Sequence, residues 1–325
     1  MPGSQVSIAL KYLESLGVDV ATQVTGLLLS HWHSDHIEGA FQLVSACENA
    51  VIHASAALFS SEAVNLAFLY KNDPFSDTDK EIREFRDIVE HLKAQGQPER
   101  FDLVHAKHSF FDDRNTGARL IALSPSTVAT TQAIERIREL KPKVGQRRVR
   151  LVAPFSENLN AVALHFSFGR FSAVLGSDLE ETGNAYTGWS AVHNSNMATQ
   201  LSLNKAHVYK VAHHGSETGH HQDIWDHLLV SQPQAMTTPY SNCHLPKESD
   251  IERITPLSSS FIITRDPKPK TKTKRNSFTD RWLKRHARHR HVINDKMGHV
   301  QIRITSDGEF SVAKSTACVE YRIEN

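Results

Sequence analysis

The feature that most constrains the fold is an apolar run that ends abruptly in a group of histidines. Residues 27–29 are three leucines, and the seven residues that follow are Ser-His-Trp-His-Ser-Asp-His. A short apolar run followed at once by polar groups is typical of a buried strand that ends in a pocket. We therefore expect a strand at 27–29 and a loop that presents its polar side chains to one site.

Four candidate metal ligands lie in this loop. His31 and His33 are two residues apart, so their side chains point to the same side of an extended chain. Asp35 is followed by Glu38 three residues later, a capping-box pattern that predicts a helix with Asp35 as its N-cap. Imidazoles suit zinc, manganese or iron, and a carboxylate adds a hard anionic ligand. We therefore expect His31, His33, Asp35 and His36 to bind metal.

A lone aspartate follows a second apolar run. Asp178 comes after residues 173–176, Ala-Val-Leu-Gly, which are expected to end a strand. Its carboxylate is a candidate metal ligand. The alternative is a helix N-cap ahead of Glu181, and the two roles do not exclude each other.

Paired histidines follow a third apolar run. His213 and His214 precede Gly215, whose conformational freedom permits a tight turn with exposed N–H groups. Together with the Ser216 hydroxyl, these groups could face an anionic oxygen. His244 lies farther along the chain as another candidate ligand.

The order of these segments resembles a known family. Residues 31–39, HWHSDHIEG, match the HxHxDH motif of the metallo-β-lactamase fold, and residues 177–180 resemble its strand-end aspartate. Residues 209–216, YKVAHHGS, resemble the signature of the hydrolase domain of the DNA-uptake channel protein ComEC and its stand-alone relatives. Residues 242–246, NCHLP, are similar to the element that follows in that branch. The resemblance runs from about residue 20 to residue 313, except for one basic insertion.

The resemblance implies an α/β fold, a four-layer αββα sandwich built as a single domain over residues 1–325. Members of this fold usually begin with strands that carry an Asp-x-Gly turn near the metals. This chain reaches its first loop histidine, His31, without such strands. We expect that the first β-hairpin is missing, either because the sequence begins inside a longer product or because the protein dispenses with it.

The resemblance also implies a site for two divalent metal ions, zinc or manganese. It places Asp178 between the ions, where one carboxylate can give an oxygen to each. His213 is the first choice as a ligand or as the proton donor to a leaving group, and His214 the second. Whether His213 or His244 is the closer ligand stays open. The predicted metal ligands are His31, His33, Asp35, His36, Asp178, His213 and His244, and the predicted catalytic residues are Asp35 and His214.

Hydrophobic periodicity and turn residues predict the other elements. Helices are expected at 6–16, 56–70, 78–94, 127–140 and 190–201, and strands at 50–53, 101–106, 119–123, 161–168, 171–175, 206–211, 234–238, 297–304 and 310–313.

Several histidines lie outside the motifs. For four candidate extra ligands a surface or structural role is favoured: His53, His91, His105 and His108. His220 and His221 are expected at the start of a helix.

Residues 265–291 form the basic insertion. They contain eleven Lys and Arg against two Asp, with Phe278 and Trp282 among them. Such a strip can neutralise phosphates and stack a base on Trp282. The alternative is a solvated insertion with no partner. The candidate nucleic-acid contacts are Lys272, Lys274, Arg275, Trp282, Lys284 and Arg285.

Composition sets the cellular context. The net charge is +1, so global charge does not indicate nucleic acid, and any such signal is local. Three scattered cysteines without CxxC spacing argue against a disulfide framework and for a reducing compartment. No apolar stretch has the length of a membrane span, and no secretory signal opens the sequence. We expect a soluble cytoplasmic protein without a membrane partner. The sequence does not identify a protein partner.

Together these features predict a metal-dependent hydrolase, specifically a phosphodiesterase or nuclease in which a metal-bound hydroxide attacks phosphorus. One alternative is a hydrolase of a small phosphodiester such as a cyclic nucleotide. Another is a non-catalytic module that binds nucleic acid or docks a partner and keeps a vestigial metal site. The fold alone does not choose among them.

Overall fold

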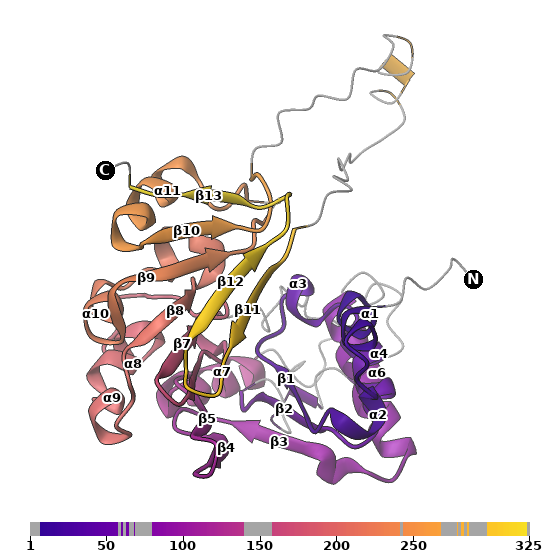
Figure 1. Cartoon of the computed structure of the whole chain (residues 1–325). Coiled ribbons are helices and arrows are strands. Elements are labelled where there is room, and N and C mark those ends of the chain that lie inside the picture. The colour runs from indigo at the N-terminus through magenta and orange to yellow at the C-terminus, as the bar shows by residue number, and fades with distance from the viewer. Residues whose placement is uncertain are drawn as a thin grey trace.

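Two β-sheets organise the chain in the computed structural model (Figure 1). The described residues are 7–57, 60, 63–64, 68, 80–139, 158–240, 243–267, 278, 281–282, 285 and 298–323. Within them the strands form a three-stranded sheet, an eight-stranded sheet and a two-stranded hairpin. Helices accompany both large sheets, so the predicted α/β class is confirmed, whereas the four-layer arrangement stays a prediction.

The three-stranded sheet comes from the N-terminal part of the chain and is entirely parallel. Its strands are β1 (Gly26–Leu29), β2 (Val51–Ser55) and β3 (Phe101–Val104), in that order. Four helices lie to the right of this sheet in Figure 1: α1 (Ile8–Ser15), α2 (Val20–Gln23), α4 (Ala40–Ala46) and α6 (Lys80–Ala94). The core here contains Trp32, Val44, Ile52, Phe85 and Leu92, each at most 2% exposed.

The larger sheet has the strand order β13-β10-β9-β8-β7-β6-β5-β4 in the described residues. Strands β4 to β7 pair antiparallel, and β7 to β10 pair parallel. The bounds are β4 (Ser109–Asp113), β5 (Ala118–Ala122), β6 (Leu164–Phe168), β7 (Phe171–Leu175), β8 (Ala206–Lys210), β9 (Leu229–Thr237), β10 (Ser260–Ile263) and β13 (Val319–Tyr321).

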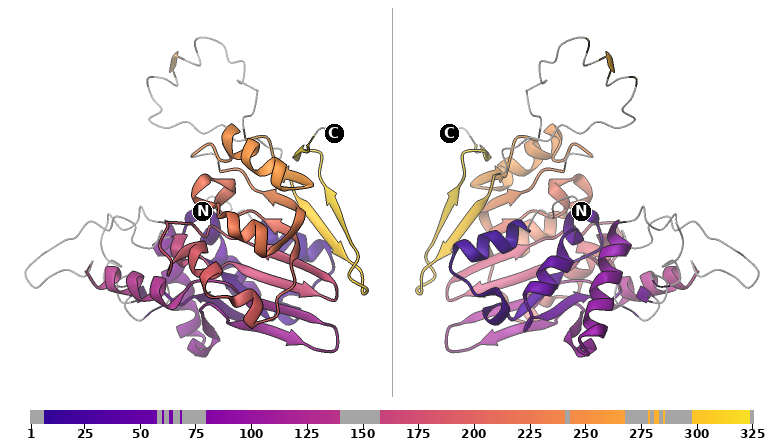
Figure 2. Two further views of the ribbon diagram at one scale, coloured as in Figure 1. Left: turned by 90° about the vertical axis from the view of Figure 1, so that its left-hand side faces the viewer. Right: turned by 90° about the vertical axis from the view of Figure 1, so that its right-hand side faces the viewer.

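Helices cover the outer face of the larger sheet, as the left view of Figure 2 shows. They are α8 (Gly188–Asn194), α9 (Met197–Gln200), α10 (Gln222–His227) and α11 (Glu248–Ile254), while α7 (Thr127–Glu139) follows β5. Buried aromatic side chains hold this layer together, including Trp189, Tyr209 and Phe261. Among the helices within the described ranges, none is long and apolar enough to cross a membrane.

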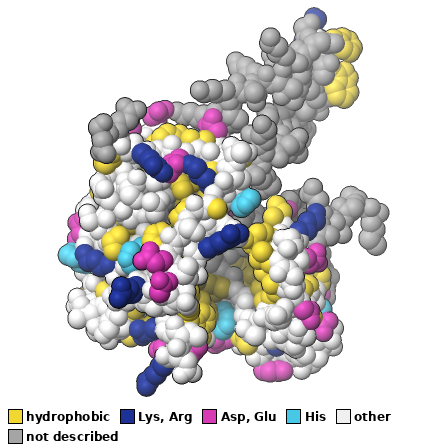
Figure 3. Space-filling view, viewed as in Figure 1, with side chains coloured by type: hydrophobic (Ala, Val, Ile, Leu, Met, Phe, Trp, Pro, Cys, Tyr) yellow, Lys and Arg dark blue, Asp and Glu magenta, His cyan; other side chains and the backbone are white. Residues whose placement is uncertain are grey.

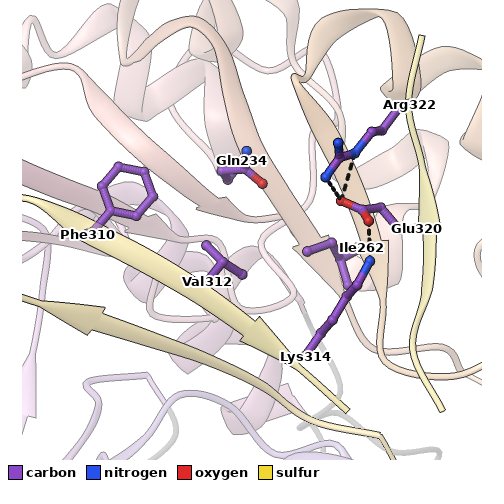
Figure 4. A pocket seen from close by; sticks show the side chains of 7 residues that line it. All are labelled: Gln234, Ile262, Phe310, Val312, Lys314, Glu320 and Arg322. Carbon is purple, nitrogen blue, oxygen red and sulfur yellow. Dashed lines mark hydrogen bonds and ion pairs between the residues drawn. The ribbon is translucent and has the colours of Figure 1, made fainter. Parts of the chain in front are cut away.

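The C-terminal hairpin packs against the larger sheet. It consists of β11 (Val300–Ile304) and β12 (Phe310–Lys314). A pocket of about 340 Å³ lies between β12 and the sheet, and Lys314 and Arg322 both pair there with Glu320 (Figure 4). Burial alone would raise the pKa of Glu320, but its hydrogen bond with Lys314 lowers that pKa to about 2. The charges of this pocket are therefore paired with one another.

Most predicted elements are present, but three strands are absent from the sequence-based prediction: β4, β10 and β13. β4 and β13 are the two outermost strands of the larger sheet, whereas β10 lies inside it, between β9 and β13. β4 carries exposed acidic side chains and β13 is short, as edge strands often are. The predicted helix at 190–201 is interrupted because Asn196 has a φ of 50°, which separates α8 from α9. Most of the predicted helix at 56–70 falls outside the described residues. So do residues 141–150, a basic segment for which the sequence predicts a solvated link between elements.

The capping box predicted at Asp35 is wrong. The short helix α3 (Ser34–Ile37) has His33 as its N-cap, and Glu38 is its C-cap. Asp35 lies inside the first turn, and its carboxylate contacts the side chains of His36 and His214. Asp178 likewise caps no helix in the described part of the chain.

We predict that Phe85→Ala lowers the free energy of unfolding by about 3–5 kcal/mol, because the substitution opens a cavity in the core. The Phe85 ring is fully buried, with its centroid 4.0 Å from that of Trp32. Chemical denaturation monitored by circular dichroism measures the change. Phe111→Ala, at a ring 43% exposed, is the control and should shift stability by less than about 0.5 kcal/mol. Equal losses in both variants would contradict this description of the core.

Candidate metal centre

The loop after β1 is held by Trp32. Its ring is 2% exposed and packs on Phe85 of α6. Because successive side chains of an extended segment alternate, burial of Trp32 on one side turns His31 and His33 to the other. The His31 Nε2 and His33 Nδ1 atoms lie 3.2 Å apart. The core contact of one residue thus orients the two candidate ligands beside it.

Asp178 arrives from the larger sheet. β7 ends at Leu175, and Gly176 and Ser177 lead to the aspartate. An added Cβ at Gly176 would lie 2.9 Å from the backbone N of Ala212, so glycine permits the close approach of this segment to the one that follows β8. The Asp178 side chain is 1% exposed. The carboxylate is therefore delivered into the interior, between the loop after β1 and the turn after β8.

The turn after β8 presents His214. His213, His214 and Gly215 all have positive φ, at 44°, 55° and 84°. An added Cβ at Gly215 would lie 3.2 Å from the Ile254 Cδ1 atom, so space as well as backbone conformation favours glycine. The His214 Nδ1 atom lies 3.0 Å from the Thr238 carbonyl oxygen, and its ring stacks on Tyr240. Donation from Nδ1 leaves Nε2 facing the carboxylates, which is the usual way a ligating histidine is oriented.

These elements bring together two groups of candidate ligand atoms, each within 4.8 Å of one another. In the first group, the Asp178 Oδ2 atom lies 3.3 Å from His36 Nε2 and 3.3 Å from His214 Nε2. Asp35 Oδ2 completes the group, 3.1 Å from His214 Nε2. The groups are Asp35, His36, Asp178 and His214, and His31, His33 and Asp178. Asp178 is common to both.

The chemistry of these residues fits bound cations. Asp178 Oδ1 is buried without a hydrogen-bond partner, while Oδ2 faces His31, His36 and His214. A buried carboxylate oxygen without a partner is costly unless something compensates it. Imidazole nitrogens and carboxylate oxygens converging on one volume are a donor set that zinc or manganese accepts. The two groups could therefore hold one ion each.

In the first group, the ionised forms of the aspartates and of His214 stabilise one another. Burial alone would raise the pKa of Asp178, but hydrogen bonds with His214 and His36 hold that pKa far below its usual value. Burial alone would lower the pKa of His214, but its hydrogen bonds to Asp178 and Asp35 raise that pKa to about 9. Without metal, a protonated His214 balances one of the two carboxylate charges, and a cation could take over that role.

The histidines of the second group behave differently. Burial lowers the pKa of His31 well below its usual value. Burial also lowers the pKa of His33. Both rings are therefore neutral near pH 7, the form in which imidazole binds metal.

Two predicted ligands lie outside both groups. The His213 Nδ1 atom lies 2.9 Å from Glu180 Oε1 and 2.9 Å from Thr218 Oγ1, and Nε2 lies 3.3 Å from Asn158 Nδ2. His244 is exposed, one residue before Leu245, which bridges to Tyr240. Their assignment as ligands stays a prediction.

The sequence reasoning missed Glu180 as the partner of His213. The signal available was its spacing, because it lies two residues after Asp178. The two remaining histidines of this region lie as expected, since His221 is the N-cap of α10 and His220 precedes it.

Little of the basic insertion lies within the described residues. Lys272, Lys274, Arg275 and Lys284 fall outside them. Phe278 is 71% exposed and Trp282 is 54% exposed. With two arginines they line a pocket of about 230 Å³: Phe278, Arg281, Trp282 and Arg285. Elsewhere, on the face in Figure 3, Lys and Arg side chains are interspersed with Asp and Glu, in keeping with the small net charge.

Comparison with known proteins agrees with the geometry of the loop after β1. Residues 2–109 match the family model of the metallo-beta-lactamase superfamily. The match contains His31, His33, Asp35 and His36, whereas Asp178 and the turn after β8 lie beyond it. A search of curated proteins found no match. The match covers about a third of the chain, and it does not address the resemblance to the ComEC-like branch. Together with the two ligand groups, it favours a metal-dependent hydrolase.

We predict that Asp178→Asn lowers the metal content of the purified protein most strongly, because Asp178 is the only residue common to both groups among the described residues. Elemental analysis after dialysis against trace zinc or manganese measures the metal-to-protein ratio. Asp223→Asn, at a carboxylate on α10, is the matched control and should keep the wild-type ratio. An unchanged ratio in Asp178→Asn would show that this carboxylate holds no ion.

Proposed function

We propose that this protein is a metal-dependent phosphodiesterase that acts on nucleic acid. The observation that carries the proposal is the sharing of the Asp178 carboxylate by two groups of ligand atoms, with one oxygen left without a hydrogen-bond partner. Two divalent ions, zinc or manganese, would when bound lower the pKa of a water molecule and neutralise charge on phosphoryl oxygens. His31 and His33 would hold one ion, and His36, Asp35 and His214 the other.

His213 is our candidate for the proton donor to the leaving oxygen. Burial alone would raise the pKa of Glu180, but its hydrogen bond with His213 lowers that pKa, so Glu180 is anionic at neutral pH. The anion holds His213 through Nδ1, and in our proposal Nε2, which lies 3.3 Å from Asn158 Nδ2, gives its proton to the leaving oxygen. Thr218 supports the pair, because its hydroxyl donates to Glu180 Oε1 over 2.9 Å.

Three features support phosphorus as the electrophile. No cysteine lies in either ligand group of the described residues, which weakens a lactamase assignment. The turn at 213–216 resembles that of a branch linked to DNA uptake. The described residues of the basic insertion combine Arg281 and Arg285 with the exposed Trp282 ring, a set that can neutralise phosphates and stack on a base.

The proposal includes the four-layer αββα arrangement. Its support is the position of α1, α2, α4 and α6 beside the smaller sheet and of α8 to α11 beside the larger one (Figure 1). In such a sandwich, loops at one edge of the two sheets can meet in a common site. The loop after β1 and the segments after β7 and β8 meet at Asp178.

We predict that His213→Gln lowers kcat by about 10²–10⁴-fold with bis(p-nitrophenyl) phosphate or an oligonucleotide, because general-acid catalysis contributes about that much. The metal content should stay at the wild-type level, since His213 lies outside both groups. His299→Gln, at an exposed histidine, is the control. Wild-type protein that binds metal but hydrolyses no phosphodiester would refute the proposed function.

We also predict that replacing residues 265–291 by a short Gly-Ser linker weakens the hydrolysis of nucleic acid but not that of small phosphodiesters. Thr264 and Gly298 are in contact, so a short linker followed by the retained residues 292–297 can span the gap. For an oligonucleotide, KM should rise and the salt dependence of binding should weaken by a slope of about one per lost phosphate contact. Turnover of bis(p-nitrophenyl) phosphate should not change. Equal kinetics on both substrates before and after the replacement would favour a small phosphodiester as the natural substrate.

A further inference from the structure

His53 and Asp102 lie side by side on the smaller sheet. The parallel pairing of β2 with β3 sets His53 opposite Asp102 in register, and register partners point to the same face of a sheet. The His53 Nδ1 atom lies 3.0 Å from Asp102 Oδ2. The pair therefore follows from the strand order.

His108 approaches the same carboxylate from the larger sheet. It directly precedes β4, and its carbonyl oxygen accepts a 2.8 Å hydrogen bond from the backbone N–H of Ala122 on β5. Its Nε2 atom lies 3.1 Å from Asp102 Oδ2. One carboxylate oxygen is thus faced by two imidazole nitrogens, and these nitrogens come from different sheets.

The two imidazole rings are held by packing. Phe110 contacts both rings nearly edge-on, with centroid distances of 4.8 Å to His53 and 4.9 Å to His108. Gly26 on β1 gives the His53 ring room, since an added Cβ there would lie 3.4 Å from its Nε2 atom. The side chains of His53 and His108 are 15% and 22% exposed, whereas that of Asp102 is 40% exposed. Phe110 and Gly26 thus pack against the imidazole rings, while the carboxylate side of the cluster is open to solvent.

We propose that His53, Asp102 and His108 form a further metal site that binds one zinc ion. Their ligand atoms all lie within 4.8 Å of one another. Tetrahedral zinc with metal–ligand distances of about 2.1 Å separates neighbouring ligand atoms by roughly 3.4 Å, so each imidazole-to-carboxylate distance, 3.0 and 3.1 Å, needs to lengthen by only a few tenths of an ångström. Two imidazoles and one carboxylate leave the fourth position to water. This site shares no residue with the groups around Asp178.

The three ligands come from both sheets, so a bound ion would stabilise the contact between the sheets. Two ligands belong to β2 and β3 of the smaller sheet, and the third is fixed to β5 of the larger sheet. An ion that binds only the folded arrangement stabilises it in proportion to its concentration over the dissociation constant. Zinc at this site would therefore tie the two sheets together, independently of hydrolysis at Asp178.

Calorimetric titration of the full chain with zinc chloride tests the site. His108→Asn should lose one zinc equivalent per chain, or weaken that site at least about 100-fold, since loss of outer-shell partners alone costs 10–100-fold. Asp102→Asn, which keeps the shape of the side chain, should do the same. His105→Asn, at an exposed histidine three residues before His108, is the matched control and should keep the wild-type stoichiometry.

Two further readouts separate this site from the centre at Asp178. Zinc should raise the melting temperature of Asp178→Asn, which keeps this site, by more than that of Asp178→Asn/His108→Asn. His108→Asn should keep wild-type hydrolysis of bis(p-nitrophenyl) phosphate, whereas failure of the proposed function would appear as inactive wild-type protein. If His108→Asn and Asp102→Asn bind zinc with wild-type stoichiometry and affinity, or if His105→Asn loses the same equivalent, the three residues form hydrogen bonds and no metal site.

Discussion

The site depends on the burial of one carboxylate. Asp178 is almost completely removed from solvent, and three imidazole nitrogens lie within 3.7 Å of its Oδ2 atom. A buried charge is tolerated only when partners compensate it, and removal of those partners is strongly destabilising. In the metal-free protein, protonated His214 supplies part of this compensation. The second oxygen of the carboxylate has no hydrogen-bond partner, which explains why cations would improve this arrangement.

Asp178 and its partners all follow the ends of strands. β1 leads to the loop with His31, β7 leads to Asp178, and β8 leads to His214. β7 and β8 are parallel neighbours, so their carboxyl ends meet at the same edge of the larger sheet. β1 belongs to the smaller sheet, and burial of Trp32 against Phe85 fixes how its loop faces the others. Residues far apart in the sequence therefore share one site because two separately packed sheets meet there.

The sequence predicted the parts of this arrangement that depend on local patterns. The alternation of His31, Trp32 and His33 was sufficient to indicate which side chains share a face, and the apolar run before Asp178 indicated β7. The strands at 161–168 and 171–175 were also predicted, and they pair as the antiparallel strands β6 and β7. The helix cap at Asp35 was predicted wrongly: the helix begins one residue earlier than the capping pattern indicates, and the Asp35 carboxylate contacts His36 and His214, which no local pattern shows. Spacing alone led to His213 as the first choice and His214 as the second, whereas the ring grouped with Asp178 is that of His214, in a turn of three successive residues with positive φ.

The cluster at His53 was beyond prediction for a different reason. Its members lie on β2, on β3 and before β4, and their meeting depends on strand register and on the contact between two sheets. Neither is encoded in spacing along the chain. The central claim, that Asp178 is shared by two metal ions, is tested most directly by anomalous X-ray diffraction at the zinc absorption edge, from crystals of the zinc-loaded full chain. We expect one anomalous peak between Asp178 and the pair His31 and His33, and a second among Asp35, His36 and His214. Zinc-loaded crystals without an anomalous peak beside Asp178 would contradict it.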